Sequence, residues 1–317
     1  MNILYKYYSD LPLSYFDEPT LKLAQPKGLN DPFESKIQNG IIMSDSVIRK
    51  KLKQLEAFAN DDKTNKTIIR NIFNLINASG VISLSETQRN ILMWAHYANE
   101  HKGLCIGYKQ NPLEIRESQR RSNHEIYYKL HKVNYDTSRY DPINDELDNE
   151  SVIRWVNSVA KKVLTTKSDE WIYEKEHRYI HPISDCDYIL SKGNMTHNAF
   201  SRSIYNSHRL TKIVDKWGET VKYSVKKKDI ITEAYIFELQ KRNNLTFLKK
   251  ISPQKISSIY LGCRYPLTKE IDLMLKLMSG DSCFSHVKVF RMQLCPMEFR
   301  LLPIQIYPPQ NKSISAL

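Results

Sequence analysis

The stretch NILMWAHYANEHKGLCIGY, residues 90–108, limits the possible fold more than any other part of the chain. Its apolar and aromatic residues recur at helical spacing, so we expect a helix over residues 89–102. Gly103 is the residue type that most often ends a helix in a left-handed conformation. The run LCIGY, which is rich in β-forming residues, follows at once. So short a connection predicts that the helix packs against the sheet to which this strand belongs.

The helical period divides this segment into two faces. One face carries Trp94, Tyr97 and His101, and the other carries His96 and Glu100. We interpret Trp94 and Tyr97 as core anchors that hold the helix on the sheet. Glu100 follows His96 by four residues, where a carboxylate can orient an imidazole, so the second face could serve a site. The alternative for His96 is a hydrogen-bonded histidine with no further role.

The remaining elements predict an α+β fold with a mixed or antiparallel sheet and packed helices. Strands are expected over residues 3–8, 21–24, 81–85, 257–262, 287–293 and 298–306. Helices are expected over residues 44–59, 68–76, 152–164 and 267–278. No strict strand–helix–strand rhythm is present, which argues against a doubly wound sheet. We predict a single domain over residues 1–317, with a basic and less regular insertion at about 185–250.

The charge balance favours polyanionic partners. Lys and Arg number 47 against 35 Asp and Glu, an excess of 12. Such a balance attracts RNA, DNA or the phosphates of a nucleotide, although many basic proteins bind no nucleic acid. Candidate contacts for RNA or DNA are the lysines of the basic region, namely Lys226, Lys227, Lys228, Lys249 and Lys250.

The five cysteines are widely spaced and form no C-x-x-C pair, so no zinc ribbon or redox motif is indicated. Free thiols fit a reducing compartment, and no apolar run is long enough to cross a membrane. We therefore expect a cytoplasmic protein without a membrane partner. The sequence also lacks a P-loop, H-E-x-x-H, G-x-G-x-x-G and G-x-S-x-G, so it predicts none of the enzyme classes built on those motifs.

The segment WIYEKEHRYI, residues 171–180, is the strongest candidate for chemistry. Read as a loop and then a strand, its alternation places Glu174, Glu176 and Arg178 on one face. Two buried carboxylates beside one arginine are costly unless they are paired. One carboxylate would pair with Arg178. The other could then act as a general base, bind a ribose hydroxyl or bind a metal.

Two further stretches hold polar side chains in defined places. QPKGLNDPF, residues 25–33, is dense in turn formers and presents Asn30 and Asp31, unless they form only a structural turn. Lys6 in the first strand could bind a phosphate, or it could be an exposed edge residue. We assign candidate catalytic roles to Glu176, His96 and Lys6. Candidate substrate contacts are Tyr5, Asn30, Asp31, Phe33, Ser85, Trp94, Tyr97, Glu174 and Arg178.

The motifs LYKYYS, LNDPFE, MWAHYANEHKGLCIGY and YEKEHR occur in an order that resembles the bacterial domain-of-unknown-function family 2971. The chain departs from the usual motifs at Tyr8, Leu84 and His177, where arginine, cysteine and tryptophan are common. Members are often met in antiphage-defence and mobile-element settings. The resemblance therefore implies an effector of this kind.

One architecture would unite these motifs. ADP-ribosyltransferases bind NAD in a cleft of a split sheet, with a glutamate on a late strand, and LYKYYS, SLSE and YEKEHR occur in a matching order. The first strand here offers Lys6 and tyrosines in place of the usual histidine or arginine. Our first hypothesis is an enzyme acting on a nucleotide or nucleic acid, with NAD as a candidate cofactor. The alternatives are a non-catalytic nucleic-acid-binding module and a sensor or partner protein of a defence operon.

Overall fold

The computed structural model describes residues 3–34, 62–113, 126–138, 151–193, 195, 199–213, 220–226, 228–242, 244–279 and 283–308. The helix predicted over residues 44–59 lies outside these ranges. Within them, helices and sheets of both strand directions occur together, so the predicted α+β class is confirmed.

The larger sheet contains eight strands in the order β15-β14-β13-β4-β1-β3-β8-β5. Their bounds are β1 (Ile3–Tyr8), β3 (Ser79–Ser85), β4 (Leu104–Lys109), β5 (Lys129–Lys132), β8 (Glu176–Pro182), β13 (Ile256–Leu261), β14 (Lys288–Leu294) and β15 (Leu301–Tyr307). Neighbouring strands are antiparallel except β13 and β14, which run parallel. The predicted mixed sheet is therefore present.

A second sheet has five antiparallel strands in the order β10-β11-β9-β12-β2. These are β2 (Thr20–Leu23), β9 (Tyr188–Lys192), β10 (Leu210–Ile213), β11 (Thr220–Val225) and β12 (Leu245–Lys250). Four of them come from the basic region that was expected to be less regular, and that expectation was wrong. Ile189, Tyr223 and Phe247 on three of these strands are fully buried, so the region contributes to the core in spite of its charge.

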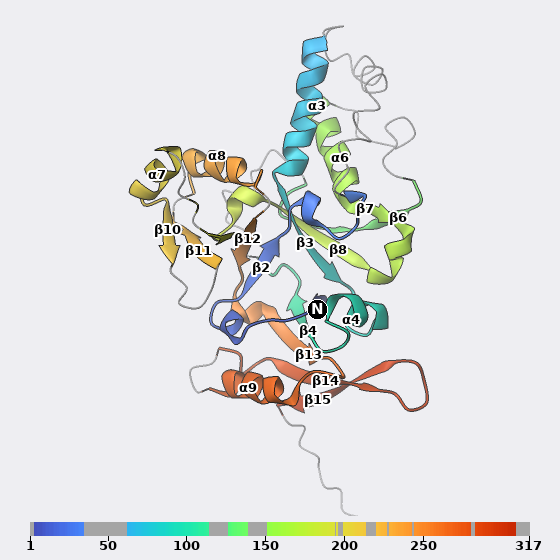
Figure 1. The fold of residues 1–317 in the computed structure, drawn as a ribbon. Coiled ribbons are helices and arrows are strands. Elements are labelled where there is room, and N and C mark those ends of the chain that lie inside the picture. Colours follow the sequence, from blue (N-terminus) through green and yellow to red (C-terminus); the bar gives the residue numbers. More distant parts are fainter. Residues whose placement is uncertain are drawn as a thin grey trace, which may run out of the picture.

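The helices are α3 (Asp62–Asn77), α4 (Ile91–Tyr97), α6 (Val152–Thr165), α7 (Ala199–Asn206), α8 (Ile230–Leu239) and α9 (Leu267–Met278). Short 3₁₀ segments are η1 (Leu13–Phe16), η2 (Pro26–Gly28), η4 (Asp169–Glu174), η5 (Ile183–Asp185) and η6 (Pro253–Lys255). A parallel pair, β6 (Asn134–Asp136) and β7 (Thr166–Ser168), lies beside η4. Figure 1 shows α3 and α6 side by side at one end of the molecule, with α9, β14 and β15 at the other.

The main hydrophobic cluster joins the two larger sheets. It contains Leu23 and Phe247 from the second sheet together with Ile82 and Ile106 from the first. A second cluster lies under α3 and α6 and is centred on Ile72 and Trp155, both fully buried. Side chains on both faces of the eight-stranded sheet are therefore buried, and the sheet forms an internal layer of the protein.

The larger sheet splits between β1 and β3. β1 pairs with β4 over six residue pairs but with β3 only where Tyr5 faces Ser85. Towards its start, β3 instead bridges the second sheet, because Val81 and Ala24 exchange backbone hydrogen bonds of 2.8 and 2.9 Å. The edge of β3 between these two contacts is therefore separated from β1, and this gap provides the space for a site.

Helix α4 is shorter than predicted. It begins after the N-cap Asn90 and ends at Tyr97, and residues 99–101 then adopt positive φ angles. Gly103 was expected to be the left-handed residue and is not, since its φ lies outside that region. A glycine is required there for another reason: a Cβ at this position would lie 2.1 Å from the Tyr8 carbonyl oxygen. The close approach of strand β1 therefore accounts for this glycine.

Candidate functional site

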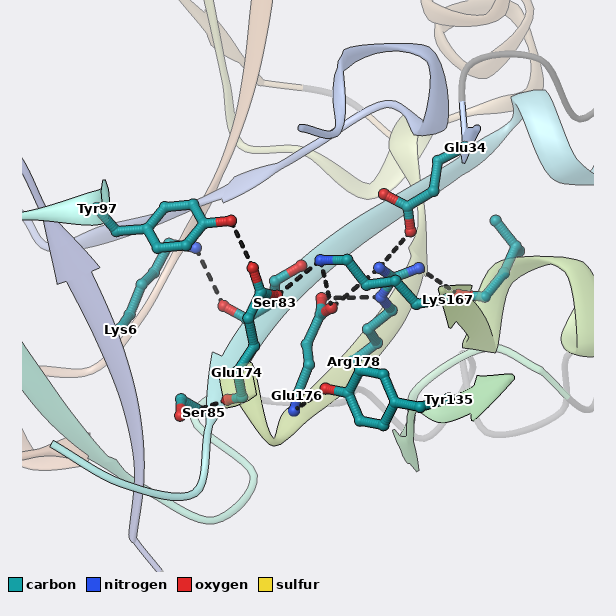
Figure 2. Close-up of polar contacts among 11 residues, drawn as sticks. Lys6, Glu34, Ser83, Ser85, Tyr97, Tyr135, Lys167, Glu174, Glu176 and Arg178 are labelled. Carbon is teal, nitrogen blue, oxygen red and sulfur yellow. Dashed lines mark hydrogen bonds and ion pairs between the residues drawn. The ribbon is translucent and has the colours of Figure 1, made fainter. Parts of the chain in front are cut away.

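A cavity of about 220 Å³ opens where β1 and β3 separate. Residues from β1, β2, η2, β3, α4, β7, η4 and β8 line it. Eight of the predicted site residues are among them: Tyr5, Lys6, Asn30, Ser85, Tyr97, Glu174, Glu176 and Arg178. Segments from the LYKYYS, LNDPFE, MWAHY and YEKEHR motifs therefore meet at one place, and Figure 2 shows Lys6, Ser85, Tyr97, Glu174, Glu176 and Arg178 among the eight side chains.

Lys6 is a cation without an acidic partner. Its Nζ donates a hydrogen bond of 3.1 Å to the carbonyl oxygen of Ser83, across the split between β1 and β3. Within the described part of the chain, no carboxylate lies within ion-pair distance of this ammonium. Burial lowers the pKa of Lys6 to about 8, although the negative charge of Glu176 opposes the shift. The side chain thus carries a poorly solvated charge that a bound anion would stabilise.

Opposite Lys6 lies a buried ion-pair cluster, which we call the site network: Glu34, Lys167, Glu174, Glu176 and Arg178. Arg178 donates to both oxygens of Glu176, from Nε at 2.8 Å and from a terminal nitrogen at 3.0 Å. The same guanidinium donates to Glu34 and, over 2.7 Å, to the carbonyl oxygen of Leu164. Its planar donor set is therefore almost fully used.

Lys167 links Glu176, the partner of this arginine, to Glu174. Its Nζ lies 2.6 Å from Oε2 of Glu174 and 3.4 Å from Oε2 of Glu176. The Tyr97 hydroxyl donates to the other oxygen of Glu174 over 2.5 Å. An ionised carboxylate offers about four acceptor positions. Glu174 therefore keeps acceptor capacity facing the cavity, whereas Glu176 is held on both oxygens by cations.

Hydrogen bonds from β3 and α4 attach the segment that presents Glu174 to its neighbours. The Ser85 hydroxyl donates to the Glu174 carbonyl oxygen over 2.7 Å, and the Asn90 side-chain amide donates to the Tyr173 carbonyl oxygen over 2.8 Å. Lys175 then takes a left-handed conformation, with φ at 46°, before strand β8 begins. Glu174 is consequently not on the strand, and the predicted alternation of Glu174 with Glu176 along it was wrong. Both side chains still converge because both reach Lys167.

Burial and pairing set the protonation states of the site network. Burial alone would raise the pKa of Glu176, but Arg178, with help from Lys167, holds it at about 2. Burial raises the pKa of Glu34 despite its contact with Arg178. Burial and the charge of Glu174 raise the pKa of the Tyr97 hydroxyl. Tyr97 is therefore a hydrogen-bond donor at neutral pH.

Four of the predicted site residues do not line the cavity. Trp94 is fully buried in a cluster behind β1, where it packs edge-on against Tyr7 at 5.3 Å between ring centroids. Asp31 is also buried, and its side chain accepts from the Phe33 amide in a turn, while Phe33 itself is exposed. The ring of His96 is exposed on α4.

The assignment of the two faces of α4 requires a correction. Tyr97 was assigned to the core-packing face and His96, with Glu100, to the face that could serve a site. The structure has Tyr97 in the cavity, and Glu100 is an exposed residue paired with Lys102 at 3.6 Å. The helix ends one turn earlier than predicted, so Glu100 is no longer one helical turn from His96.

Sequence reasoning missed several residues of the site. Glu34 directly follows NDPF and belongs to the quoted motif LNDPFE, so its acidic side chain was a usable signal. Lys167, by contrast, lies in the stretch TTKSD and matches no motif. The Tyr135 hydroxyl accepts a hydrogen bond of 2.7 Å from the backbone amide of Glu176. Long-range pairing of β6 with β7 brings Tyr135 and Lys167 to the site, and sequence periodicity cannot reveal that pairing.

Most of the lysines predicted to contact nucleic acid are paired with acids. Lys228 and Lys249 interact with Asp185 and Asp187 at distances from 2.7 to 3.6 Å, and we call these four residues the seam network. Lys250 lies 2.5 Å from a Glu18 oxygen. Lys226 is exposed, and Lys227 lies outside the described residues. The proposed contact with RNA or DNA through these lysines stays a prediction.

The fold and the cavity define an α+β protein with a polar site in a split sheet. Residues 93–179 match the model of a family described as Protein of unknown function (DUF2971), which confirms the predicted family. This segment carries Tyr97, Lys167, Glu174, Glu176 and Arg178. No curated protein and no solved structure matches the chain. In the described part of the chain, no helix is long and apolar enough to cross a membrane.

Proposed function

We propose that this protein is an enzyme that binds a nucleotide in the cavity between β1 and β3. The observation that carries the proposal is Lys6, a cation without an acidic partner among the described residues, facing the hydrogen-bonded pair of Tyr97 and Glu174. A phosphate would balance the charge of Lys6. Lys22 also lines the cavity and adds positive charge on the same side.

The opposite wall suits the sugar of such a ligand. Glu174 keeps acceptor positions for ribose hydroxyls, and Lys167 and Tyr97 hold its carboxylate in place. Breaking a bond between a ribose and a nitrogen base develops positive charge on the ribose ring. A carboxylate fixed in advance stabilises that charge. Glu176, held on both oxygens, acts in this proposal by orienting Lys167 and Arg178.

NAD is the first ligand to test, and cleavage of its bond to nicotinamide is the first reaction. With water as the acceptor, NAD and water would give ADP-ribose, nicotinamide and a proton. With a nucleophilic group on another molecule as the acceptor, the same step would be ADP-ribosyl transfer. The split sheet supports this choice by analogy of fold alone.

The test combines binding and turnover. We expect Lys6→Met to weaken NAD binding by about tenfold or more, because one charge-assisted contact to phosphate is lost. We expect Glu174→Gln to retain binding and to lower nicotinamide release by about a hundredfold. Lys241→Met is the matched control, since Lys241 is an exposed residue just after α8 whose one ion pair among the described residues is with Glu238.

Melting temperatures of the variants separate loss of site from loss of fold. The proposal fails if neither NAD nor any adenine nucleotide binds the wild-type protein at millimolar concentration. It also fails as an enzyme if Glu174→Gln turns over as fast as the wild type. Binding without turnover of any nucleotide would favour the alternative of a non-catalytic binding or sensor protein.

We further propose that the protein is a cytoplasmic effector in phage defence or in a mobile element. Support comes from the family resemblance and from the five cysteines, which are all free thiols. Wild-type protein expressed in a bacterial host should reduce phage plaque formation, and Lys6→Met should restore it. Equal plaque numbers with both proteins would contradict this role.

A further inference from the structure

Three half-buried or exposed aromatic side chains form a row beside the cavity. They are Trp171 and Tyr173 of η4 and His96 of α4. The Trp171 and Tyr173 rings lie 6.1 Å apart between centroids, and the Tyr173 and His96 rings lie 6.3 Å apart. We call these three residues the aromatic row. Aromatic rings usually bury their faces in a core, so a row of rings at the surface indicates a binding surface.

Each member of the row is linked to a residue of the cavity, either along the chain or through Lys167. Tyr173 precedes Glu174 in the chain, and His96 precedes Tyr97, and both of these following residues line the cavity. The third member, Trp171, is linked to the cavity through Lys167. The Lys167 Nζ lies 4.6 Å from the Trp171 ring centroid and 2.6 Å from Glu174. A ligand whose polar end reaches Glu174 and which extends past Lys167 would meet the Trp171 ring.

We propose that the aromatic row is the binding surface for the base of the nucleotide, which stacks there while its ribose and phosphate occupy the cavity. This inference rests on the proposed function and adds the position of the base. Each nucleobase has a flat π-face, and stacking on aromatic side chains contributes to affinity without selecting a particular base. The cation of Lys167 lies over the Trp171 ring and fixes its place next to the cavity.

The experiment compares two ligands that differ only by the base. Adenosine monophosphate and ribose 5-phosphate share the sugar and the phosphate, so both should bind, and the first should bind more tightly. Trp171→Ala and Tyr173→Ala should each weaken adenosine monophosphate by roughly tenfold. The affinity for ribose 5-phosphate should stay within about twofold of the wild-type value. Trp171→Phe, which keeps a ring, should recover most of the loss.

The intervening residue provides a matched control. Ile172 lies between the two aromatic residues in the same segment and is 61% exposed. Ile172→Ala should leave both affinities unchanged. Calorimetric titration gives the affinities, and thermal unfolding shows whether each variant is folded.

The outcomes distinguish failure of the stacking surface from failure of the proposed function. If neither ligand binds the wild-type protein, the proposed function fails together with this inference. If ribose 5-phosphate binds as tightly as adenosine monophosphate, the proposed function stands and the stacking surface is wrong. The stacking surface is also wrong if Trp171→Ala weakens both ligands equally, because the row would then act only by supporting Lys167.

Discussion

The protein contains two buried networks of charged side chains that differ in one respect. The seam network has two carboxylates and two lysines, which pair with one another. The site network has three carboxylates against two cations. The compensating charge comes from Lys6, which lies across the cavity and contacts no carboxylate among the described residues.

This difference distinguishes a structural network from one that can bind a ligand. In the seam network every charge is neutralised locally, and none of its four residues lines the cavity. In the site network the balance depends on a group on the other side of an open space. A ligand with a phosphate near Lys6 and hydroxyls near Glu174 would complete the pairing. Buried charge alone is therefore a weaker indicator of function than charge left without a local partner.

The largest expected effect is on stability. Arg178→Met leaves Glu34 and Glu176 buried with only Lys167 near them, and we expect a loss of about 3–5 kcal/mol in unfolding free energy. Lys249→Met should cost less, because Lys228 still contacts both aspartates. Urea denaturation measures both values. Equal losses would show that the two networks do not differ in the way we describe.

An intermediate effect is expected on the pH dependence of binding. Lys6 has a pKa of about 8 in the free protein, so its ammonium is mostly present at pH 7 and mostly lost at pH 9. Affinity for a phosphorylated ligand should therefore fall about tenfold over this interval. Lys6→Met should bind weakly at both pH values, and Lys249→Met should show the wild-type profile. A flat wild-type profile would mean that Lys6 does not contact the anion.

The smallest effect is expected at Glu34. The pKa of Glu34 is raised by burial, so ionising this carboxyl group is harder in the folded protein than in the unfolded chain, and stability linked to that shift is present at low pH and lost as pH rises. Because the cost of burying this carboxylate outweighs the contribution of its pairing with Arg178, Glu34→Gln should change the unfolding free energy at pH 7 by less than about 1 kcal/mol. Glu176 has the opposite sign, because its pKa of about 2 gives stability that is lost as pH falls from about 4.5 towards 2. A larger loss for Glu34→Gln than for Glu176→Gln at pH 7 would reverse this assignment.

Local patterns predicted the elements well where a hydrophobic period was strong. Helix α9 has the predicted bounds, and strands β1, β2 and β13 lie where runs of β-forming residues were found. The end of α4 was not predictable from residue preferences, since Glu100 adopts a positive φ angle that glutamate rarely takes. The close approach of Gly103 to the Tyr8 carbonyl oxygen is a tertiary contact, and it determines which residue type fits at position 103.

Sequence reasoning identified one part of the candidate site and missed the other. Lys6, Tyr97 and Glu174 were among the predicted site residues, and these residues do come together. Which side chain of a helix faces a cavity depends on the angle at which the helix meets the sheet. Residue spacing alone could not decide between Tyr97 and His96. Lys167 depends on the pairing of β7 with β6, for which a three-residue strand gives no periodic signal.

Because Tyr5 and Ser85 form the single register pair between β1 and β3, we expect this boundary to act as a hinge line within the larger sheet. Five strands lie on one side of this line and three on the other. A molecule that binds Lys6 and Glu174 would touch both sides and act as a brace across the hinge. Amide hydrogens of β3 should then exchange more slowly with solvent deuterium when the cavity is filled. A bound ligand would in this way make the larger sheet more rigid.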